Sequence, residues 1–317
     1  MEKILVDKSR LYVKSGIITL NGVSLPDYYW LIEKEKQKIE IVIRTIKELG
    51  FNTIRVPVLP GHFLFYNNYL NKTIKNIVDL SAKYKLYCIL DWHAIGNPLH
   101  NQTRLKEYFH IKNNKPILWY SANLEIASSG LDILSKLFGK YKHVIFEIYN
   151  EPCPAEKDIL QLDLSALPWK EWRKIAGDLI SIVRKNTKNL ILVSSNYWSF
   201  NLKSTSEDPF NEYSNIAYSF HCYPFKNNKN WKEMLDSMKE FPVVVTEFGY
   251  DTDKKSQYNS SYDDYLKPFM DYLRRNRISW IGWCFSSSWR SRIVLKWQPL
   301  ELSDFGKHII KNLIRNN

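Results

Sequence analysis

Short apolar runs alternate with amphipathic helical patterns along the whole chain. Eight runs have the length and the β-branched composition of buried strands: residues 17–23, 53–58, 86–91, 144–149, 190–194, 216–220, 243–246 and 278–283. Helices are predicted over residues 33–49, 69–84, 121–138, 168–186, 262–276 and 303–314. Strands that are apolar on both faces are typical of a parallel sheet covered by helices, so an α/β protein is predicted.

The rhythm of these elements favours one architecture. Eight strands separated by helical patterns predict a single (β/α)8 barrel formed by residues 1–317, rather than an open doubly wound sheet. No glycine-rich phosphate loop follows the first run, which argues against a dinucleotide-binding fold. A small hairpin is expected at about residues 1–16. The long connection 92–120, rich in Asn, Pro, His and aromatic residues, is interpreted as a functional surface loop.

The composition is compatible with this fold and raises one question about partners. Of the 317 residues, 44% are hydrophobic, which is enough for a large core, and the net charge of +12 raises the question of a nucleic-acid partner. The basic residues are spread beside acidic ones, as in residues 33–36, and no basic arm or RNA-binding signature is present. We therefore expect no nucleic-acid partner. The 15% of aromatic residues can stack on sugars or fill the core, and do not choose a ligand.

Metal, redox and membrane functions receive little support. The four cysteines, Cys88, Cys153, Cys222 and Cys284, form no CxxC pair and no metal-ligand spacing, so free thiols and no metal site are expected. Residues 1–10 carry charges where a signal peptide needs an apolar core, so either the protein is not exported by that route or its signal is absent from this sequence. No apolar run approaches the roughly 20 residues that span a bilayer. A monomer without membrane contact is expected.

Polar side chains gather where the predicted strands end. In a (β/α)8 barrel the chemistry lies at the carboxyl ends of the strands. The polar or aromatic residues at these ends are Arg55, Asp91, His93, Asn150, Glu151, Asn196, His221, Tyr223, Glu247 and Trp283. Two of them, Glu151 and Glu247, end apolar strands, and two carboxylates at one rim suit acid–base or covalent chemistry on a glycosidic bond. The sequence does not give their separation, which decides between the retaining and the inverting reaction.

These residues occur in motifs that resemble a known family. Asn150-Glu151-Pro152 and Glu247-Phe248-Gly249 resemble the fourth- and seventh-strand motifs of glycoside hydrolase family 5, the retaining (β/α)8-barrel glycosidases also called cellulase family A. Other signatures of the family are matched, in order along most of the chain, by Gly50–Pro57, Leu90–His93, His221–Tyr223 and Trp283. One departure is Ala94, which stands where many relatives carry a second histidine.

The resemblance implies a role for each carboxylate. Glu151 would be the general acid and then the general base, and Glu247 would be the nucleophile that forms a covalent glycosyl-enzyme. Arg55 and Tyr223 would donate hydrogen bonds to Glu247, which agrees with the need of a nucleophilic carboxylate for a cationic, donor-rich setting. No metal or organic cofactor is implied.

The resemblance also implies substrate-binding residues. Asn150 would hold the sugar 2-hydroxyl, His93 and His221 would line the site, and Trp283 would form a floor beneath the reacting sugar. From its place after the fifth strand, Trp198 is the preferred stacking platform. Four further tryptophans lie in predicted loops near the rim, where stacking on sugar and packing of the loop are equally open: Trp30, Trp119, Trp289 and Trp297.

Three residues near the rim also have structural interpretations. Glu147 faces the same side of its strand as Glu151, and a buried hydrogen-bond network is favoured for it over catalysis. Asp91 is interpreted as a structural acceptor. Arg55 could serve as an ion-pair partner inside the barrel, although its place at the end of an apolar strand favours a role in the site.

The leading functional hypothesis is a retaining endo-β-1,4-glucanase that acts on a β-linked oligo- or polysaccharide. The alternatives are the same chemistry on β-mannan, xyloglucan or β-1,3-glucan, and a transglycosylase that passes the glycosyl group to a sugar instead of water. A carbohydrate-binding pseudoenzyme on the same barrel is a further alternative, disfavoured because both glutamates are present.

Overall fold

The strands of the chain close into a barrel. The computed structural model describes residues 1–154, 167–224 and 230–314. The barrel strands are β4 (Asn21–Ser24), β5 (Thr53–Val58), β6 (Tyr87–Trp92), β11 (Val144–Glu147), β13 (Ile191–Ser194), β14 (Ile216–Cys222), β15 (Val243–Phe248) and β16 (Ser279–Gly282). All neighbours are parallel, and β16 pairs with β4 to close the ring. The predicted (β/α)8 barrel is therefore confirmed.

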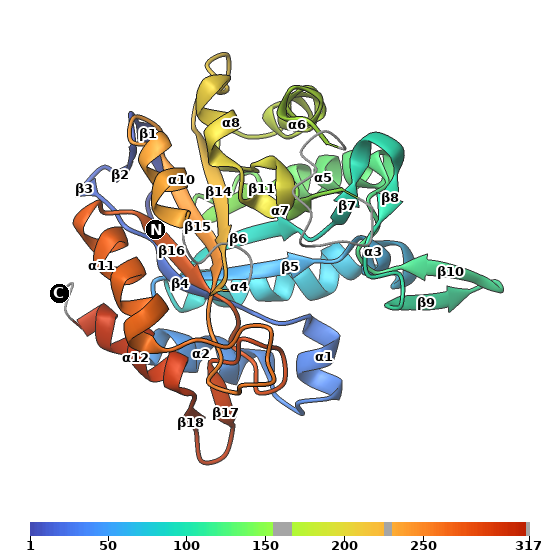
Figure 1. Cartoon of the computed structure of the whole chain (residues 1–317). Helices are drawn as coiled ribbons and strands as arrows, with labels where there is room; N and C mark the ends of the chain where they lie inside the picture. The colour runs from blue at the N-terminus through green and yellow to red at the C-terminus, as the bar shows by residue number, and fades with distance from the viewer. Residues whose placement is uncertain (155–166, 225–229, 315–317) are drawn as a thin grey trace.

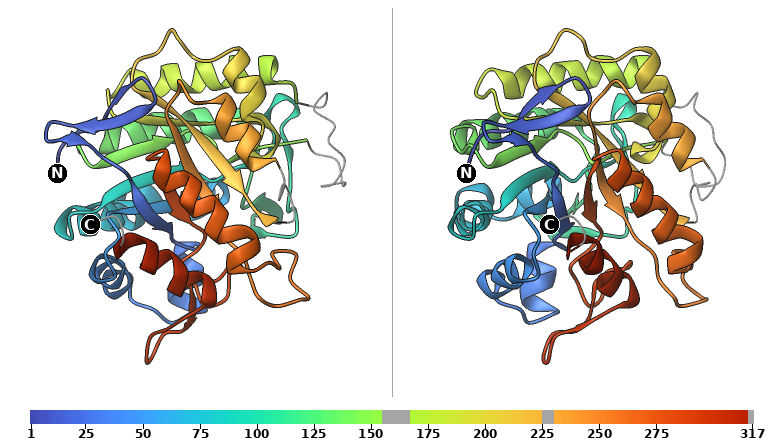
Figure 2. Two further views of the ribbon diagram at one scale, coloured as in Figure 1. Left: turned by 60° about the vertical axis from the view of Figure 1, so that its left-hand side comes forward. Right: turned by 90° about the vertical axis from the view of Figure 1, so that its left-hand side faces the viewer.

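Helices surround this barrel (Figures 1 and 2). They are α2 (Ile39–Glu48), α4 (Lys75–Lys83), α5 (Leu124–Phe138), α6 (Trp169–Arg184), α8 (Leu202–Glu207), α10 (Trp231–Ser237), α11 (Lys267–Arg275) and α12 (Asp304–Ile314). The shorter helical segments are α1 (Tyr28–Glu33), α3 (Pro60–Phe65), η1 (Tyr69–Ile74), η2 (Pro98–His100), α7 (Asn196–Ser199) and η4 (Tyr262–Leu266). Each long helix buries one apolar face; in α2 these residues are Ile39, Val42, Ile43 and Ile46. Among the described residues, no helix is both long and apolar enough to span a bilayer.

Two boundaries near the N-terminus differ from the prediction. The helix predicted over residues 33–49 is divided, because Lys36 adopts a left-handed conformation with φ 57° that ends α1 before α2 begins. The strand predicted over residues 17–23 is divided as well. Gly16–Ile17 (β3) joins a small antiparallel sheet with β1 (Leu5–Asp7) and β2 (Arg10–Val13), and the barrel strand starts only at Asn21.

The connection after β6 has more structure than a surface loop. It forms β7 (Ile95–Asn97) and β8 (Gln102–Thr103), and then a hairpin of β9 (Phe109–Lys112) and β10 (Lys115–Leu118) that projects from the body (Figure 1). Asn113 and Asn114 join its strands with φ of 53° and 59°, the left-handed pair that a two-residue hairpin turn requires. Two further short strands, β17 (Val294–Lys296) and β18 (Glu301–Leu302), pair after β16.

The amino-end half of the barrel interior is filled by hydrocarbon. We call the following buried residues the apolar layer: Ile4, Leu11, Leu20, Tyr87, Ile89, Ile145, Leu190, Leu192, Ala217, Val244 and Ile281. Ile4 and Leu11 come from the N-terminal end of the chain, so the small β1–β3 sheet closes this end of the barrel. All four cysteines are buried outside the apolar layer, and the described part of the chain has no disulfide bond, which agrees with the expectation of thiols. Polar groups that could take part in a reaction therefore lie in the opposite half of the barrel interior.

Candidate active site

One buried arginine organises the carboxyl end of the barrel. Arg55 is fully buried and donates Nε to Glu147 Oε2 at 2.6 Å, Nη1 to Glu247 Oε1 at 2.8 Å and Nη2 to Asn150 Oδ1 at 2.7 Å. Its Nη2 also lies 3.0 Å from Asp91 Oδ2. We call Arg55, Asp91, Glu147, Asn150 and Glu247 the charged layer. Burial alone would lower the pKa of Arg55, but the three carboxylates outweigh it and raise the pKa, so the guanidinium stays charged.

A β-bulge aims Glu247 into the cleft. In the pairing of β14 with β15, Val245 lies opposite Phe220, and Glu247 lies opposite His221, so Thr246 is an extra residue. Without that insertion, strict alternation would place Val244 and Thr246 inside the barrel and turn Glu247 outward. Thr246 keeps its inward direction and its Oγ1 lies 3.1 Å from His221 Nε2. The bulge thus brings two successive side chains to the site.

Both oxygens of Glu247 have a strong donor. Arg55 binds Oε1, and the Tyr223 hydroxyl donates to Oε2 at 2.8 Å. Burial and the negative charge of Glu247 hold the pKa of Tyr223 well above its usual value, so the phenol keeps its proton and acts as a donor. These are the two hydrogen bonds to Glu247 that the sequence led us to expect. Donors on both oxygens fix the orientation of this carboxylate.

Glu151 lies beside Glu247 in a different environment. It belongs to the two-residue strand β12 (Glu151–Pro152), which pairs with β7. Its Oε1 lies 3.1 Å from His221 Nδ1, and His221 Nδ1 is 3.6 Å from Glu247 Oε2. Carboxylate oxygens of the two glutamates lie within 4.8 Å of each other. This bound on the oxygen atoms agrees with the carboxyl groups about 5–5.5 Å apart that are typical of retaining glycosidases.

The three acidic and imidazole groups also raise the question of a metal ion. Glu151, His221 and Glu247 offer ligand atoms within 4.8 Å of one another, and they are the one such group among the residues described. The positive charge that two adjacent carboxylates need is already supplied by Arg55. Because both Glu247 oxygens accept from protein donors, the hydrogen bonds account for the arrangement without an ion.

His93 and Trp283 form a flat wall next to the carboxylates. The imidazole and the indole are stacked with centroids 5.6 Å apart and planes 3° apart. His93 Nδ1 is hydrogen-bonded to Asp91 Oδ2, and Trp283 Nε1 donates to Arg290 O at 3.1 Å. Asp91 therefore acts as a structural acceptor, as interpreted from the sequence.

Asn150 presents an unused donor to the cleft. Its Oδ1 is held by Arg55, which fixes the orientation of the amide. Its Nδ2 is buried and has no hydrogen-bond partner among the described residues. A buried amide donor without a partner is costly, and a ligand hydroxyl would satisfy it. Glu147, by contrast, is fully engaged by Arg55 and by Ser219 Oγ at 2.7 Å, which agrees with the structural role expected for it.

Most of the expected site residues line one cleft of about 470 Å³. His93, Asn150, Glu151, Trp198, Tyr223, Glu247 and Trp283 face it, whereas Arg55 and His221 lie behind the glutamates. Of the other four rim tryptophans, Trp30 and Trp289 belong to the cleft lining and Trp119 and Trp297 do not.

Trp198 reaches the cleft through an unusual backbone. Tyr197, Trp198 and Ser199 have φ of 58°, 59° and 58°, three successive left-handed residues without a glycine. Such conformations cost free energy and concentrate at functional sites. The Arg104 guanidinium lies 5.4 Å from the Trp198 ring centroid, a cation–π contact that helps to hold the indole.

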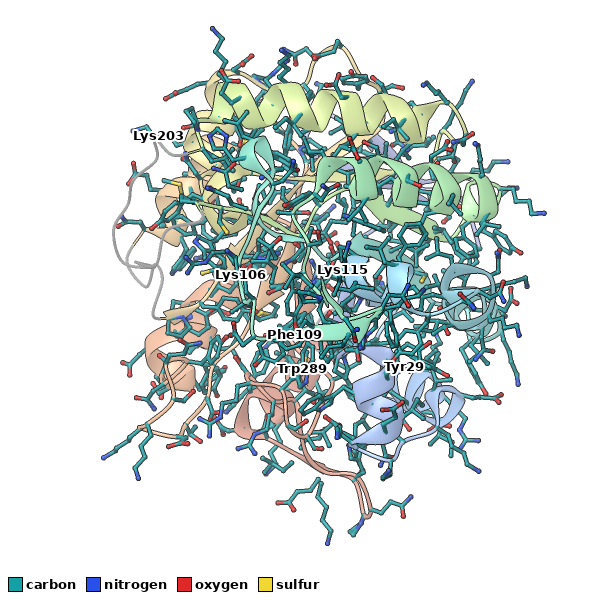
Figure 3. All side chains as sticks on the ribbon, turned by 90° about the vertical axis from the view of Figure 1, so that its right-hand side faces the viewer. Tyr29, Lys106, Phe109, Lys115, Lys203 and Trp289 are labelled. Carbon is teal, nitrogen blue, oxygen red and sulfur yellow. The ribbon has the colours of Figure 1, made fainter. Side chains whose placement is uncertain are left out.

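Several lining residues were not anticipated from the sequence. They are Ile95, Leu105, Tyr108, Tyr120, Gln257, Tyr258, Ser288 and Arg290. All come from loops or from the insertion after β6, where no strand-end rule applies. Figure 3 views the face from which the hairpin projects, and both Phe109 of β9 and Trp289 of the loop after β16 lie near its middle. Aromatic residues on long loops were the available signal, and they do not say which loops meet.

Fold and cleft together define a class: (β/α)8 barrels with a close pair of carboxylates at the carboxyl ends of the strands. Residues 13–288 match the family described as "Cellulase (glycosyl hydrolase family 5)", and the chain belongs to this family.

Individual relatives agree with that assignment. The chain is 23% identical to an endoglucanase from Clostridium saccharobutylicum, an alignment that covers 95% of this chain and 62% of the relative. The first three curated relatives are longer proteins, of which the chain spans 42% to 62%. Among solved structures, the β-glucanase SdGluc5_26A from Saccharophagus degradans has a TM-score of 0.84 at 20% identity, covering 99% of this chain and 94% of that one. A β-mannanase from Thermomonospora fusca has a TM-score of 0.72 at 19% identity, covering 98% and 95%.

Proposed function

We propose that this chain is a retaining β-glycoside hydrolase that cleaves β-1,4-linked glucan internally. The observation that carries the proposal is the pair of glutamates whose oxygens lie within 4.8 Å in one cleft, with different partners. Membership of family 5 and the endoglucanase among the relatives support a glucan substrate. The structurally similar β-glucanase from Saccharophagus degradans has been solved with cellotetraose.

The proposed reaction has two displacements. A Glu247 oxygen attacks the anomeric carbon while the glycosidic C–O bond breaks and Glu151 gives its proton to the departing oxygen. A water molecule then attacks the same carbon, Glu151 takes a proton from it, and the ester bond to Glu247 breaks. Two inversions leave the product in the configuration of the substrate.

The partners of the two carboxylates support this division of roles. Glu247 accepts hydrogen bonds from a guanidinium and a phenol, which orient it for attack as the nucleophile. Glu151 lies 3.1 Å from His221 Nδ1, and it is proposed as the group that gives and then takes the proton. Asn150 Nδ2 is proposed to bind the sugar hydroxyl next to the reacting carbon, and Trp283 and Trp198 to stack on sugar rings.

The test combines a substrate panel with stereochemistry. Reducing-sugar release is measured on carboxymethylcellulose, barley β-glucan, glucomannan, galactomannan, xyloglucan, xylan and laminarin, with Glu151→Gln and Glu247→Gln beside the wild type. We expect release from the β-1,4-glucans and its loss in both variants. Early proton NMR spectra are expected to show the β-anomer as the first product. An α-anomer, or activity that survives both substitutions, would contradict the proposal.

Azide distinguishes the two glutamates. In Glu247→Ala, azide is expected to enter the vacated space and give an α-glycosyl azide from an activated β-glycoside. In Glu151→Ala the glycosyl-enzyme still forms from an activated substrate, and azide is expected to give a β-glycosyl azide. The reverse pattern would exchange the roles.

The β-mannanase among the structural neighbours supplies a specific reason to consider a second substrate. Its fold similarity at 19% identity leaves the sugar open. Galactomannan and glucomannan in the panel decide this point, because a mannanase would release sugar from both and not from barley β-glucan.

A further inference from the structure

A half-buried glutamate outside the carboxylate pair is tied to one wall of the cleft. Glu35 lies between α1 and α2, distant in sequence from the loop after β16. Its Oε1 accepts from the hydroxyls of Ser286 and Ser288, the latter at 2.6 Å. Its Oε2 accepts from the Ser287 amide and hydroxyl, both at 3.1 Å, and from Trp297 Nε1 at 2.8 Å. One carboxylate thus accepts five hydrogen bonds.

These hydrogen bonds keep Glu35 ionised. Burial would raise the pKa of Glu35, but donation by the serine hydroxyls, the Ser287 amide and the Trp297 indole outweighs it and lowers the pKa. Charge-assisted hydrogen bonds are about twice as strong as neutral ones. Without the Glu35 carboxylate, the three consecutive serines would lose the acceptor that they share.

The segment that Glu35 holds belongs to the cleft. Ser288 and Trp289 line it, and the loop continues to Arg290, whose carbonyl accepts from Trp283 Nε1. The Trp289 ring lies 5.9 Å from Trp283 and 6.0 Å from Trp30.

Trp30 is connected to the same anchor. Its indole Nε1 donates to Ser288 Oγ at 2.7 Å, and this hydroxyl in turn donates to Glu35. A hydroxyl group has one hydrogen to donate. Because Ser288 donates it to Glu35, the direction of the hydroxyl is fixed, and a lone pair of Ser288 Oγ is left to accept from Trp30. The Trp289 amide donates to Ser286 Oγ at 2.9 Å, and this hydroxyl also donates to Glu35, so Trp30 and Trp289 share one carboxylate as their support.

We propose that Glu35 is a positioning residue for glycan binding: it fixes the Trp30–Trp289 wall of the cleft and thereby sets affinity for the sugar rings that lie against this wall. This inference rests on the proposed function, because it assumes a glycan in the cleft. The hydrogen bonds of Glu35 go to the serine loop and to Trp297, so Glu35 acts on the glycan through the tryptophans, and we expect bond cleavage to be spared.

The test separates binding from chemistry. Glu35→Gln replaces one acceptor oxygen by an amide that cannot accept, whereas Glu35→Asp keeps the charge on a shorter side chain. Glu33→Gln is the matched control, because Glu33 is exposed on α1. For each variant, kcat and KM are measured on cellotetraose well below the melting temperature. The Kd of cellotetraose is measured by calorimetry in the Glu151→Gln background.

We expect Glu35→Gln to raise KM and Kd about tenfold and to leave kcat nearly unchanged. A tenfold change corresponds to the loss of roughly one hydrogen bond to a charged group. Glu35→Asp should recover part of the loss, and Glu33→Gln should match the wild type. Trp30→Phe, which keeps a ring but removes the indole donor, should raise KM as well and add little to Glu35→Gln, because both act on one network.

The outcomes are distinguishable. A lower melting temperature with unchanged KM and Kd would make Glu35 a structural staple and overturn the inference, while the proposed function stands. A fall in kcat alone would overturn it too. If the wild type neither cleaves nor binds cellotetraose, the proposed function fails and the inference falls with it.

Discussion

The two halves of the barrel interior are built from the same strands but hold opposite chemistry. At the amino ends the apolar layer is hydrocarbon and is closed by the small β1–β3 sheet. At the carboxyl ends the charged layer places a fully buried arginine among three carboxylates. Buried apolar side chains in the first half stabilise the fold. Buried charges in the second half destabilise it unless each charge is paired.

The change occurs within single strands. On β6 the inward residue Ile89 is followed two positions later by Asp91, and on β11 Ile145 is followed by Glu147. Register pairs these residues across the two strands, Ile89 with Ile145 and Asp91 with Glu147. On these two strands one step of two residues therefore separates the apolar layer from the charged layer, whereas on β15 the bulge at Thr246 lengthens the step from Val244 to Glu247 to three residues. Substitutions in the two layers should have different consequences.

The largest effect is expected for Arg55→Met. The variant leaves the buried Asp91, Glu147 and Glu247 carboxylates without their counter-charge, so we expect the free energy of unfolding to fall by about 3–5 kcal/mol. Loss of the donor to Glu247 should lower kcat/KM by a further factor of at least about 10²–10³. Urea denaturation and initial rates on barley β-glucan measure the two effects.

Arg44→Met is the control for that substitution, because Arg44 is exposed and pairs with Glu48 at 3.6 Å on the surface of α2. It should leave both quantities unchanged. If Arg55→Met folded with normal stability and normal activity, the charged layer would have neither of the roles given to it.

The apolar layer is expected to affect stability alone. Leu192→Ala removes a fully buried side chain and should cost about 2–5 kcal/mol of unfolding free energy through lost burial and the cavity that remains. Per folded molecule, kcat/KM should equal that of the wild type. Leu64→Ala, at an exposed position on α3, is the comparison for stability. A clear loss of kcat/KM in Leu192→Ala at low temperature would show that the two layers are coupled.

Tyr223→Phe tests the hydrogen bond from the Tyr223 hydroxyl to Glu247 Oε2. A hydrogen bond to a charged group contributes about 1.5–3 kcal/mol, so kcat/KM should fall roughly 10- to 100-fold with little change in melting temperature. Tyr218→Phe, on β14, removes a hydroxyl that accepts from the Phe210 amide and should leave kcat/KM unaltered. Equal activity of Tyr223→Phe and wild type would mean that Arg55 alone orients Glu247.

The architecture and the strand-end residues could both be predicted from the sequence, for the same physical reason. Parallel strands bring their carboxyl ends to one rim, so residues such as Arg55, Asn150 and Tyr223 could be placed together from their position after apolar runs alone. Their catalytic and binding roles remain proposals that the substitutions test.

Features that depend on a single residue or on distant contacts could not be predicted in that way. The bulge at Thr246 leaves no mark in an apolar run, yet without it Glu247 would face outward. Tyr258 reaches the cleft from a loop whose path is set by tertiary contacts. The Asn113–Asn114 turn, by contrast, had a recognisable signal in two residues that tolerate a left-handed backbone, between short alternating strands.

The smallest predicted effect lies outside both layers and concerns pH. His110 on β9 is hydrogen-bonded through Nε2 to His62 Nδ1 at 2.9 Å and stacks on Phe65. Burial, and then the neighbouring His62, lower the pKa of His110 from 6.5 to about 4. The folded chain therefore binds fewer protons here than the unfolded chain, and the contribution of His110 is complete above pH 6.5 and lost as the pH falls towards 4.

We expect His110→Phe to flatten the decline of unfolding free energy between these two pH values, by a modest amount because His110 is partly exposed to solvent. Urea denaturation at several pH values compares it with the wild type and with His100→Asn, an exposed control. Parallel curves for wild type and His110→Phe would place the acid-sensitive groups elsewhere, and the charged layer would be the first region to examine. A flatter curve with unchanged kcat would instead show that acid loosens the hairpin attachment while both layers of the barrel stay intact.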